Sequence, residues 1–118
     1  MDIIKGKMIA GKGIGKTMGF PTVNIPYDGE LNGVFAARVF CADKKYVAAV
    51  NVGARPTFDD AEKLCEIFLL DCDEDFEVGT EFEVKLVNKV REIKKFANLD
   101  ELKEQIAKDV DFVKMTLC

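Results

Sequence analysis

The segment AGKGIGKT, residues 10–17, has the composition of a loop that binds phosphate. Glycines let the backbone come close to a ligand and point its N–H groups at phosphate oxygens, and Lys12 and Lys16 add positive charge. The glycines of this stretch are Gly11, Gly13, Gly15 and, slightly later, Gly19. A flexible glycine hairpin would have the same composition, so both interpretations stay open at this point.

The same segment nearly matches the Walker pattern G-x-x-x-x-G-K-[ST], with Ala10 in place of its first glycine. A Walker loop must lie between a parallel strand and a long helix. Here MGFPTVNIPYDG follows, and Pro21 and Pro26 would interrupt a helix in its first turns. The β-branched residues at 22, 23 and 25 favour a strand instead. We therefore reject a P-loop fold and keep the possibility of a phosphate loop on another scaffold.

Two oxygen-bearing side chains, Thr22 and Asn24, follow the glycine-rich segment at alternate positions of the predicted strand. Alternate residues of a strand face the same side. Hydroxyl and amide oxygens suit Mg²⁺, which completes its coordination with water and nucleotide phosphates. The alternative is that both are ordinary polar surface residues.

Glu66 is the candidate general base. The chain has no histidine, so a base must be a carboxylate, lysine, cysteine or tyrosine. In the segment KLCEIFLLDC, Glu66 shares a strand face with apolar Leu64 and Phe68, which is unusual for a carboxylate. An edge strand that exposes Glu66 to solvent would explain the pattern equally well. After a later strand, Arg91 and Phe96 belong either to a solvated loop or to a site for a planar ligand.

The elements that would position these residues are mostly strands. Alternation and apolar runs predict strands over residues 33–42, 45–53, 63–72 and 80–90, with weaker signals at 3–9 and 22–25. The first two form a predicted hairpin. Apolar residues spaced three or four apart predict one helix over residues 99–117, with Asn98 and Glu101 as a capping box. Strands followed by one helix indicate a small antiparallel barrel or sandwich.

Composition narrows the function classes. The 118 residues suit one domain, and the formal net charge of −4 disfavours a broad nucleic-acid surface. No segment is long and apolar enough to cross a membrane, and the N-terminus does not have the pattern of a secretory signal. Four cysteines without a C-x-x-C pair, in a chain without histidine, argue against a zinc site. We expect a cytoplasmic protein with reduced thiols.

Five ordered segments together resemble the riboflavin kinase family. GFPTVN resembles the signature G-[FI]-P-T-A-N, and GVFAARV resembles the strand that carries G-V-Y. NVGARPTF is similar to N-[IV]-G-x-[RN]-P-T-F, and CEIFLLD is similar to the E-x-H strand with the catalytic glutamate. VREIKKFANLDELKEQIAKD resembles the R-x-E-x-x-F loop and closing helix. The resemblance covers residues 6–117, nearly the whole chain.

The resemblance implies a mainly β, six-stranded antiparallel Greek-key barrel with a C-terminal helix, as one domain over residues 1–118. It implies Mg²⁺-dependent transfer of the γ-phosphoryl group of ATP to the 5′-hydroxyl of riboflavin, giving FMN and ADP. By matched position, Glu66 would be the catalytic base and would contact flavin with Arg91 and Phe96. Thr22 and Asn24 would hold the metal. The nucleotide-binding residues would be Gly11, Gly13, Gly15, Lys16, Thr17, Gly19, Pro21, Thr22 and Asn24. The apolar strand face beside Glu66 would offer a surface for the flavin ring.

The chain also departs from the family pattern. Phe68 replaces the histidine of the E-x-H strand, and DFEVGT at residues 75–80 replaces the more frequent D-L-Y-G. Bacterial relatives usually carry an N-terminal adenylyltransferase domain, and we expect that activity to be missing here. Two rival functions are a non-catalytic flavin- or nucleotide-binding module on the same barrel and a generic barrel for macromolecular contacts. We expect a monomer without a nucleic-acid or membrane partner.

Overall fold

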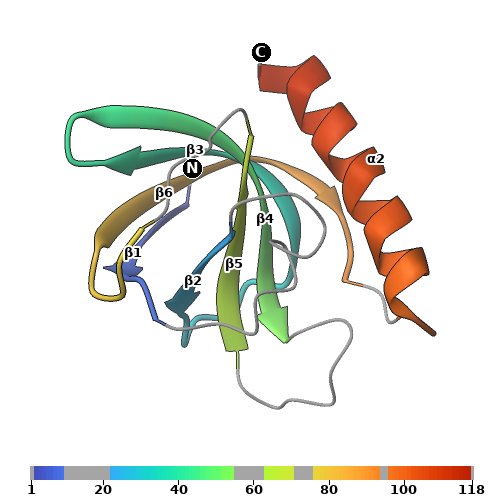
Figure 1. The fold of residues 1–118 in the computed structure, drawn as a ribbon, viewed down its shortest axis with the longest axis horizontal. Coiled ribbons are helices and arrows are strands. Elements are labelled where there is room, and N and C mark those ends of the chain that lie inside the picture. The colour runs from blue at the N-terminus through green and yellow to red at the C-terminus, as the bar shows by residue number, and fades with distance from the viewer. Residues whose placement is uncertain (1, 10–21, 55–62, 71–75, 94–95, 118) are drawn as a thin grey trace.

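The computed structural model describes residues 2–9, 22–54, 63–70, 76–93 and 96–117. Its strands are β1 (Ile3–Lys7), β2 (Thr22–Pro26), β3 (Gly33–Cys41), β4 (Lys44–Ala54), β5 (Lys63–Leu69) and β6 (Glu81–Arg91), and they are followed by the helix α2 (Leu99–Leu117). The strands form one antiparallel sheet in the order β1-β6-β3-β4-β5-β2, curled into a nearly closed barrel (Figure 1). The expected six-stranded Greek-key barrel with a C-terminal helix is thereby confirmed.

The barrel closes where β1 approaches β2. The main-chain N–H of Ile9 donates to the carbonyl oxygen of Asn24 over 2.8 Å, in an isolated antiparallel bridge. Gly6 lies directly against the Ile25 side chain, and a β-carbon at residue 6 would collide with the Cγ2 atom of Ile25. Glycine is therefore required at residue 6 by the close approach of the two edge strands.

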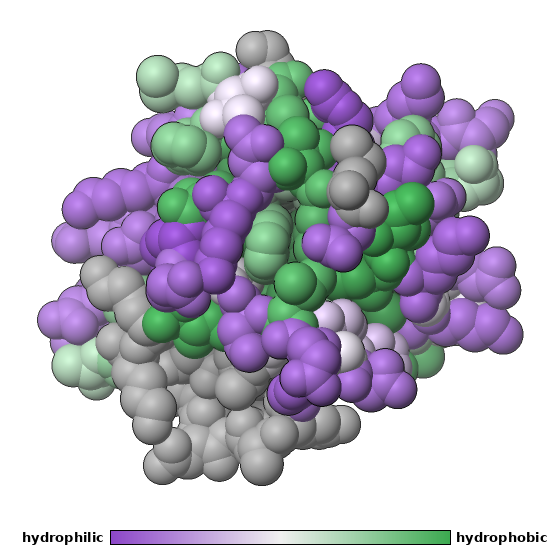
Figure 2. Space-filling view, turned by 180° about the vertical axis from the view of Figure 1, so that it is seen from behind, coloured by the Kyte–Doolittle hydropathy of each residue, from purple (hydrophilic) through white to green (hydrophobic). Residues whose placement is uncertain are grey.

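Alternation along each strand separates the barrel interior from its outer surface. In β5 the side chains of Cys65, Ile67 and Leu69 enter the interior cluster, so Glu66 and Phe68 face outward. The predicted alternation in β6 is confirmed in the same way, with the apolar side chains of Phe82, Val84 and Leu86 inside. On the face turned away from the view of Figure 1, hydrophilic side chains cover much of the surface around a central hydrophobic area (Figure 2).

The helix α2 lies along the outside of the barrel and covers part of β3 and β4 (Figure 1). Its buried side chains Leu102, Ile106, Val110 and Val113 form a second apolar cluster with Ala36, Ala49, Phe68 and Leu70 of the sheet. The side-chain oxygen of Asn98 accepts from the Glu101 N–H over 2.9 Å, which confirms the predicted cap. The Glu101 carboxylate reaches back to the N–H of Ala97 rather than to that of Asn98.

The hairpin of β3 and β4 is also confirmed, one residue earlier than expected. The turn contains Ala42, which adopts the left-handed conformation with φ of 54°, and β4 starts at Lys44. Residues 22–26 form a strand, not a helix, which confirms the rejection of a P-loop fold for this part of the chain.

Gly6→Ala tests how the barrel closes. Forcing a methyl group against Ile25 should lower the free energy of unfolding by about 1–3 kcal/mol. This loss outweighs the opposing stabilisation of roughly 0.4–1 kcal/mol that comes from the lower conformational entropy of the unfolded chain. Urea unfolding measures the change. The matched test repeats Gly6→Ala in an Ile25→Ala background, where the loss should shrink because the colliding atom is gone. Equal losses in both backgrounds would show that the contact does not restrict residue 6.

Candidate active site

Three polar side chains form a row on the outer surface of the barrel. In the strand register, Asn24 of β2 lies opposite Glu66 of β5, and Glu66 lies opposite Asn51 of β4. Directly opposite residues of antiparallel strands point to the same face with Cβ atoms about 4.5–5.5 Å apart. The sheet therefore places one carboxylate between two carboxamides, although the three residues are far apart in the sequence.

This polar row is only partly open to solvent. Asn24 is 6% exposed and Asn51 is 5% exposed, while Glu66 is intermediate. Buried carboxamides normally have hydrogen-bond partners, because an unsatisfied polar group loses its hydration without compensation. Glu66 thus lies in a sheltered polar environment rather than on an open edge, which argues against the solvent-exposed alternative.

The neighbouring thiol of Cys65 is excluded as a base. Its side chain points into the barrel, and burial, with a smaller contribution from the negative charge of Glu66, raises the pKa of Cys65 to about 12. Such a thiol stays protonated at neutral pH. Of the two adjacent side chains, only Glu66 is placed to accept a proton from a ligand at the outer surface.

The outward side chains that follow Glu66 on β5 do not form the open surface expected for a flavin ring. Phe68, on the apolar face that was expected to offer a surface for a flavin ring, is 7% exposed because α2 packs on it, and Leu70 on the same face is 5% exposed. Phe68 therefore acts as a core residue between the sheet and the helix, which gives a physical reason for an aromatic side chain at this departure from the family pattern. The helix also closes one side of the polar row, since Phe68 and Thr22 lie opposite one another one step along the same strands.

Arg91, at the end of β6, is bound to the helix. Its guanidinium donates to both carboxylate oxygens of Asp109, over 2.9 to 3.2 Å, and to the carbonyl oxygen of Glu92. Asp109 is 4% exposed and also accepts from the side chain of Gln105. The guanidinium carbon lies 5.8 Å from the ring centre of Phe96. Arg91 and Phe96 thus meet at the junction of β6 and α2, apart from Glu66 on β5, and their role toward flavin stays a prediction.

Several predicted site residues lie outside the described residues. These are Gly11, Gly13, Gly15, Lys16, Thr17, Gly19 and Pro21, so the proposed phosphate loop stays a prediction. Two residues that sequence reasoning assigned no role prove important. Asp109 fixes Arg91, and Asn51 completes the polar row. Asn51 stood in the quoted NVGARPTF segment, but only the register between β4 and β5 places it beside Glu66.

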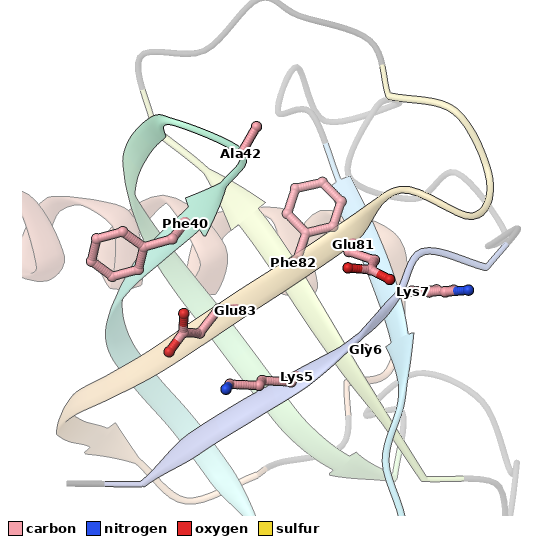
Figure 3. A pocket seen from close by; sticks show the side chains of 8 residues that line it. All are labelled: Lys5, Gly6, Lys7, Phe40, Ala42, Glu81, Phe82 and Glu83. Atoms are coloured by element: carbon pink, nitrogen blue, oxygen red, sulfur yellow. The ribbon is translucent and has the colours of Figure 1, made fainter.

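A hollow of about 520 Å³ lies elsewhere on the barrel, between β1, β6 and the β3 end of the hairpin (Figure 3). Lys5 lies opposite Glu83, and Lys7 lies opposite Glu81, so its lysines and glutamates balance in charge. A phosphate site needs an excess of positive charge or converging N–H groups. This hollow therefore does not have the electrostatics of a nucleotide site.

Glu66 is the single carboxylate of the polar row, so most oxygens that could bind a metal there are neutral. Within the described ranges, no three side chains of His, Cys, Asp or Glu gather as metal ligands. Thr22 and Asn24 instead present one hydroxyl and one amide from the same strand face. This sparse ligand set fits Mg²⁺ bound mainly by nucleotide phosphates and water.

The Flavokinase family, described as riboflavin kinase, matches the chain over residues 3–117. The bifunctional riboflavin kinase/FMN adenylyltransferase of Escherichia coli K12 is 39% identical over 110 residues, which cover 90% of this chain and 35% of that protein. The RNA-binding riboflavin kinase RibR of Bacillus subtilis is 35% identical over 96% of this chain and 50% of its own length. The chain thus spans about a third to a half of the length of these relatives.

Two solved structures share the fold. A macrolide-efflux protein from Streptococcus pneumoniae superposes with a TM-score of 0.80 at 28% identity, over 95% of this chain and 38% of that one. Riboflavin kinase from Trypanosoma brucei superposes with a TM-score of 0.66 at 22% identity, over 98% and 78%. Because the first is named for a different activity, the barrel alone does not decide what the chain does.

The ion pair of Arg91 and Asp109 should stabilise the junction of the barrel and the helix. Asp109→Ala leaves a guanidinium that is 17% exposed without its carboxylate, and breaking a buried pair in this way costs about 3–5 kcal/mol. The matched control is Glu92→Ala, which removes the exposed pair of Lys89 and Glu92 and should cost about 0–1 kcal/mol. Urea unfolding of both variants checks this, and similar losses would contradict the assigned role of Asp109.

Proposed function

The chain belongs to the riboflavin kinase family, and from this premise we propose that it transfers the γ-phosphoryl group of ATP to the 5′-hydroxyl of riboflavin, giving FMN. The observation that supports this most is the register of β2 and β5, which sets Glu66 directly opposite Asn24. In this proposal the base and one ligand of a nucleotide-bound metal lie on adjacent strands, which supports the close positioning on which phosphoryl transfer depends.

Glu66 acts as the general base in this proposal. Its carboxylate accepts a hydrogen bond from the 5′-hydroxyl, orients the oxygen toward the γ-phosphorus and takes its proton as the new bond forms. The uncharged carboxamides of Asn24 and Asn51 flank this carboxylate on the neighbouring strands. The helix and the apolar side chains beneath it keep this side of the site dry.

The nucleotide side of the site is β2. Thr22 and Asn24 would hold Mg²⁺, which neutralises charge on the transferring phosphoryl group when bound. The glycine-rich segment directly precedes β2 in the sequence, so its N–H groups and Lys16 would bind the phosphates next to Asn24. The proposal therefore assigns ATP to the β2 side of Glu66, and riboflavin to the other side.

The remaining expectations concern partners and location. No helix among the described residues is long and apolar enough to span a bilayer. We infer that the chain acts as a single domain and a monomer in the cytoplasm on riboflavin and ATP, without nucleic acid. One relative is named as RNA-binding. The net charge of −4 favours a small-molecule role for this chain.

Glu66→Gln tests the base. Glutamine keeps the shape but cannot accept the proton, and losing a positioned base lowers kcat by about 10²–10⁴-fold. FMN formation from riboflavin and ATP with Mg²⁺ is measured beside the melting temperature and both substrate affinities. Glu83→Gln, at the distant end of β6, is the matched control and should retain the parental rate. A folded Glu66→Gln variant that binds both substrates and forms FMN at a near-parental rate would refute the catalytic role. A parent protein that binds flavin without forming FMN would favour the non-catalytic module.

Thr22→Ala and Asn24→Ala test the metal ligands. Each should raise the Mg²⁺ concentration needed for half-maximal rate by about tenfold, the effect of losing roughly 1.4 kcal/mol of binding. The affinity for riboflavin alone should not change. Thr116→Ala, whose hydroxyl lies on an exposed part of α2, serves as the matched control. Parental Mg²⁺ dependence in both Thr22→Ala and Asn24→Ala would remove these residues from the metal site.

A further inference from the structure

Asn51 is an unusual asparagine. It lies in the middle of the sheet, on β4, and only 5% of it is exposed. Its side-chain nitrogen, Nδ2, is buried and has no hydrogen-bond partner, the only such side-chain atom among the described residues. The carboxamide therefore carries two N–H donors that make no hydrogen bond to any residue that the structure describes.

A purely structural role does not explain this side chain. Leaving a buried donor unsatisfied costs about 1–3 kcal/mol relative to a satisfied one. Its neighbours on the same face of β4 are Ala49, which is 2% exposed, and Gly53, so this strand places no polar side chain beside it. An apolar side chain would be the stable choice at residue 51, unless the donor meets an acceptor that comes from outside the chain.

The register indicates where that acceptor comes from. Asn51 lies opposite Glu66 on the side away from Asn24, in the strand sequence β2-β5-β4. Neighbouring strands are about 4.8 Å apart, so the two carboxamides flank the carboxylate at similar distances. If β2 holds the nucleotide, β4 faces the substrate that Glu66 deprotonates.

The surface beyond Asn51 supports this direction. Gly53, two residues further on the same face of β4, has φ of 118° and no side chain. The side chains of Asn32 and Ile93 occupy the space that a β-carbon at Gly53 would take, and Ile93 follows Arg91 of β6. Ile93, next to the loop that the family resemblance links to flavin, thus meets β4 at Gly53, two residues from Asn51.

We propose that Asn51 is a further substrate-binding residue, whose Nδ2 donates to a hydroxyl oxygen of the polyol chain of the acceptor. This inference rests on the proposed kinase function. The donor fixes the chain next to the hydroxyl held by Glu66, so that the reacting oxygen faces the nucleotide. The NH₂ group of a carboxamide donates hydrogen bonds, and only its oxygen can bind Mg²⁺, so the role proposed for Nδ2 of Asn51 differs from the metal-binding role proposed for Asn24.

Asn51→Leu tests the inference, because leucine has a similar size and no donor. Riboflavin affinity, measured by fluorescence without ATP, should fall about tenfold, while ATP affinity stays within about twofold. The melting temperature should not fall, since the variant removes an unsatisfied donor. Asn88→Leu, on the exposed part of β6, is the matched control and should bind riboflavin normally.

Lumiflavin, in which a methyl group replaces the polyol chain, sharpens the test. Asn51→Leu should weaken riboflavin and leave lumiflavin binding unchanged. Equal weakening of both flavins, or weakening of ATP binding instead, overturns the assignment of Nδ2 to the polyol chain.

A second pair of variants applies if Asn51→Leu does not fold. Asn51→Thr, which keeps a donor on a β-branched side chain, is compared with Asn51→Val, which has nearly the same shape without the donor. The hydroxyl variant should then bind riboflavin more tightly than the valine variant, and equal affinities overturn the inference. A parent that neither binds nor phosphorylates riboflavin refutes the proposed function itself, whereas an active parent with an unaffected Asn51→Leu variant refutes only this inference.

Discussion

The arrangement of this molecule depends on the filling of the barrel interior by every second side chain. Ile25, Ile67, Val50 and their neighbours are fully buried, and their exclusion from water fixes the register of each strand against the next. A slip of one residue in β5 would turn Ile67 outward and force Glu66 into the apolar interior. The position of the carboxylate beside two carboxamides is therefore a consequence of apolar packing on the opposite face of the same strands.

The helix performs the second part of this positioning. Small side chains at Ala36 and Ala49 let α2 approach the sheet, while Phe68 fills the space between them. The pair of Arg91 and Asp109 then joins the last strand to the middle of the helix. Such a bidentate, mostly buried pair has a restricted geometry, so it fixes the end of β6 against α2.

Much of this architecture could be predicted from the sequence, because it follows from local patterns. The alternation in β6, the spacing in α2 and the cap at Asn98 each depend on neighbours in the chain. The polar row could not be predicted in full, since Asn51 meets Glu66 only through the pairing of two strands. The role of Asp109 could not be predicted for a related reason. In the sequence it is one more acidic residue of a charged helix, and only the packing of α2 buries it against Arg91.

The adjacent residues Cys65 and Glu66 show how closely chemistry depends on register. One residue apart on β5, they point to opposite faces of the same sheet, and the interior raises the pKa of the thiol to about 12. The apolar cluster that surrounds the thiol therefore keeps it protonated and inaccessible, and the same packing directs the carboxylate outward. A related barrel with other side chains at the positions of Asn24, Asn51 and Glu66 would keep the packing and lose this chemistry. The proposed kinase activity therefore depends on these three outward positions, and the barrel alone does not determine it.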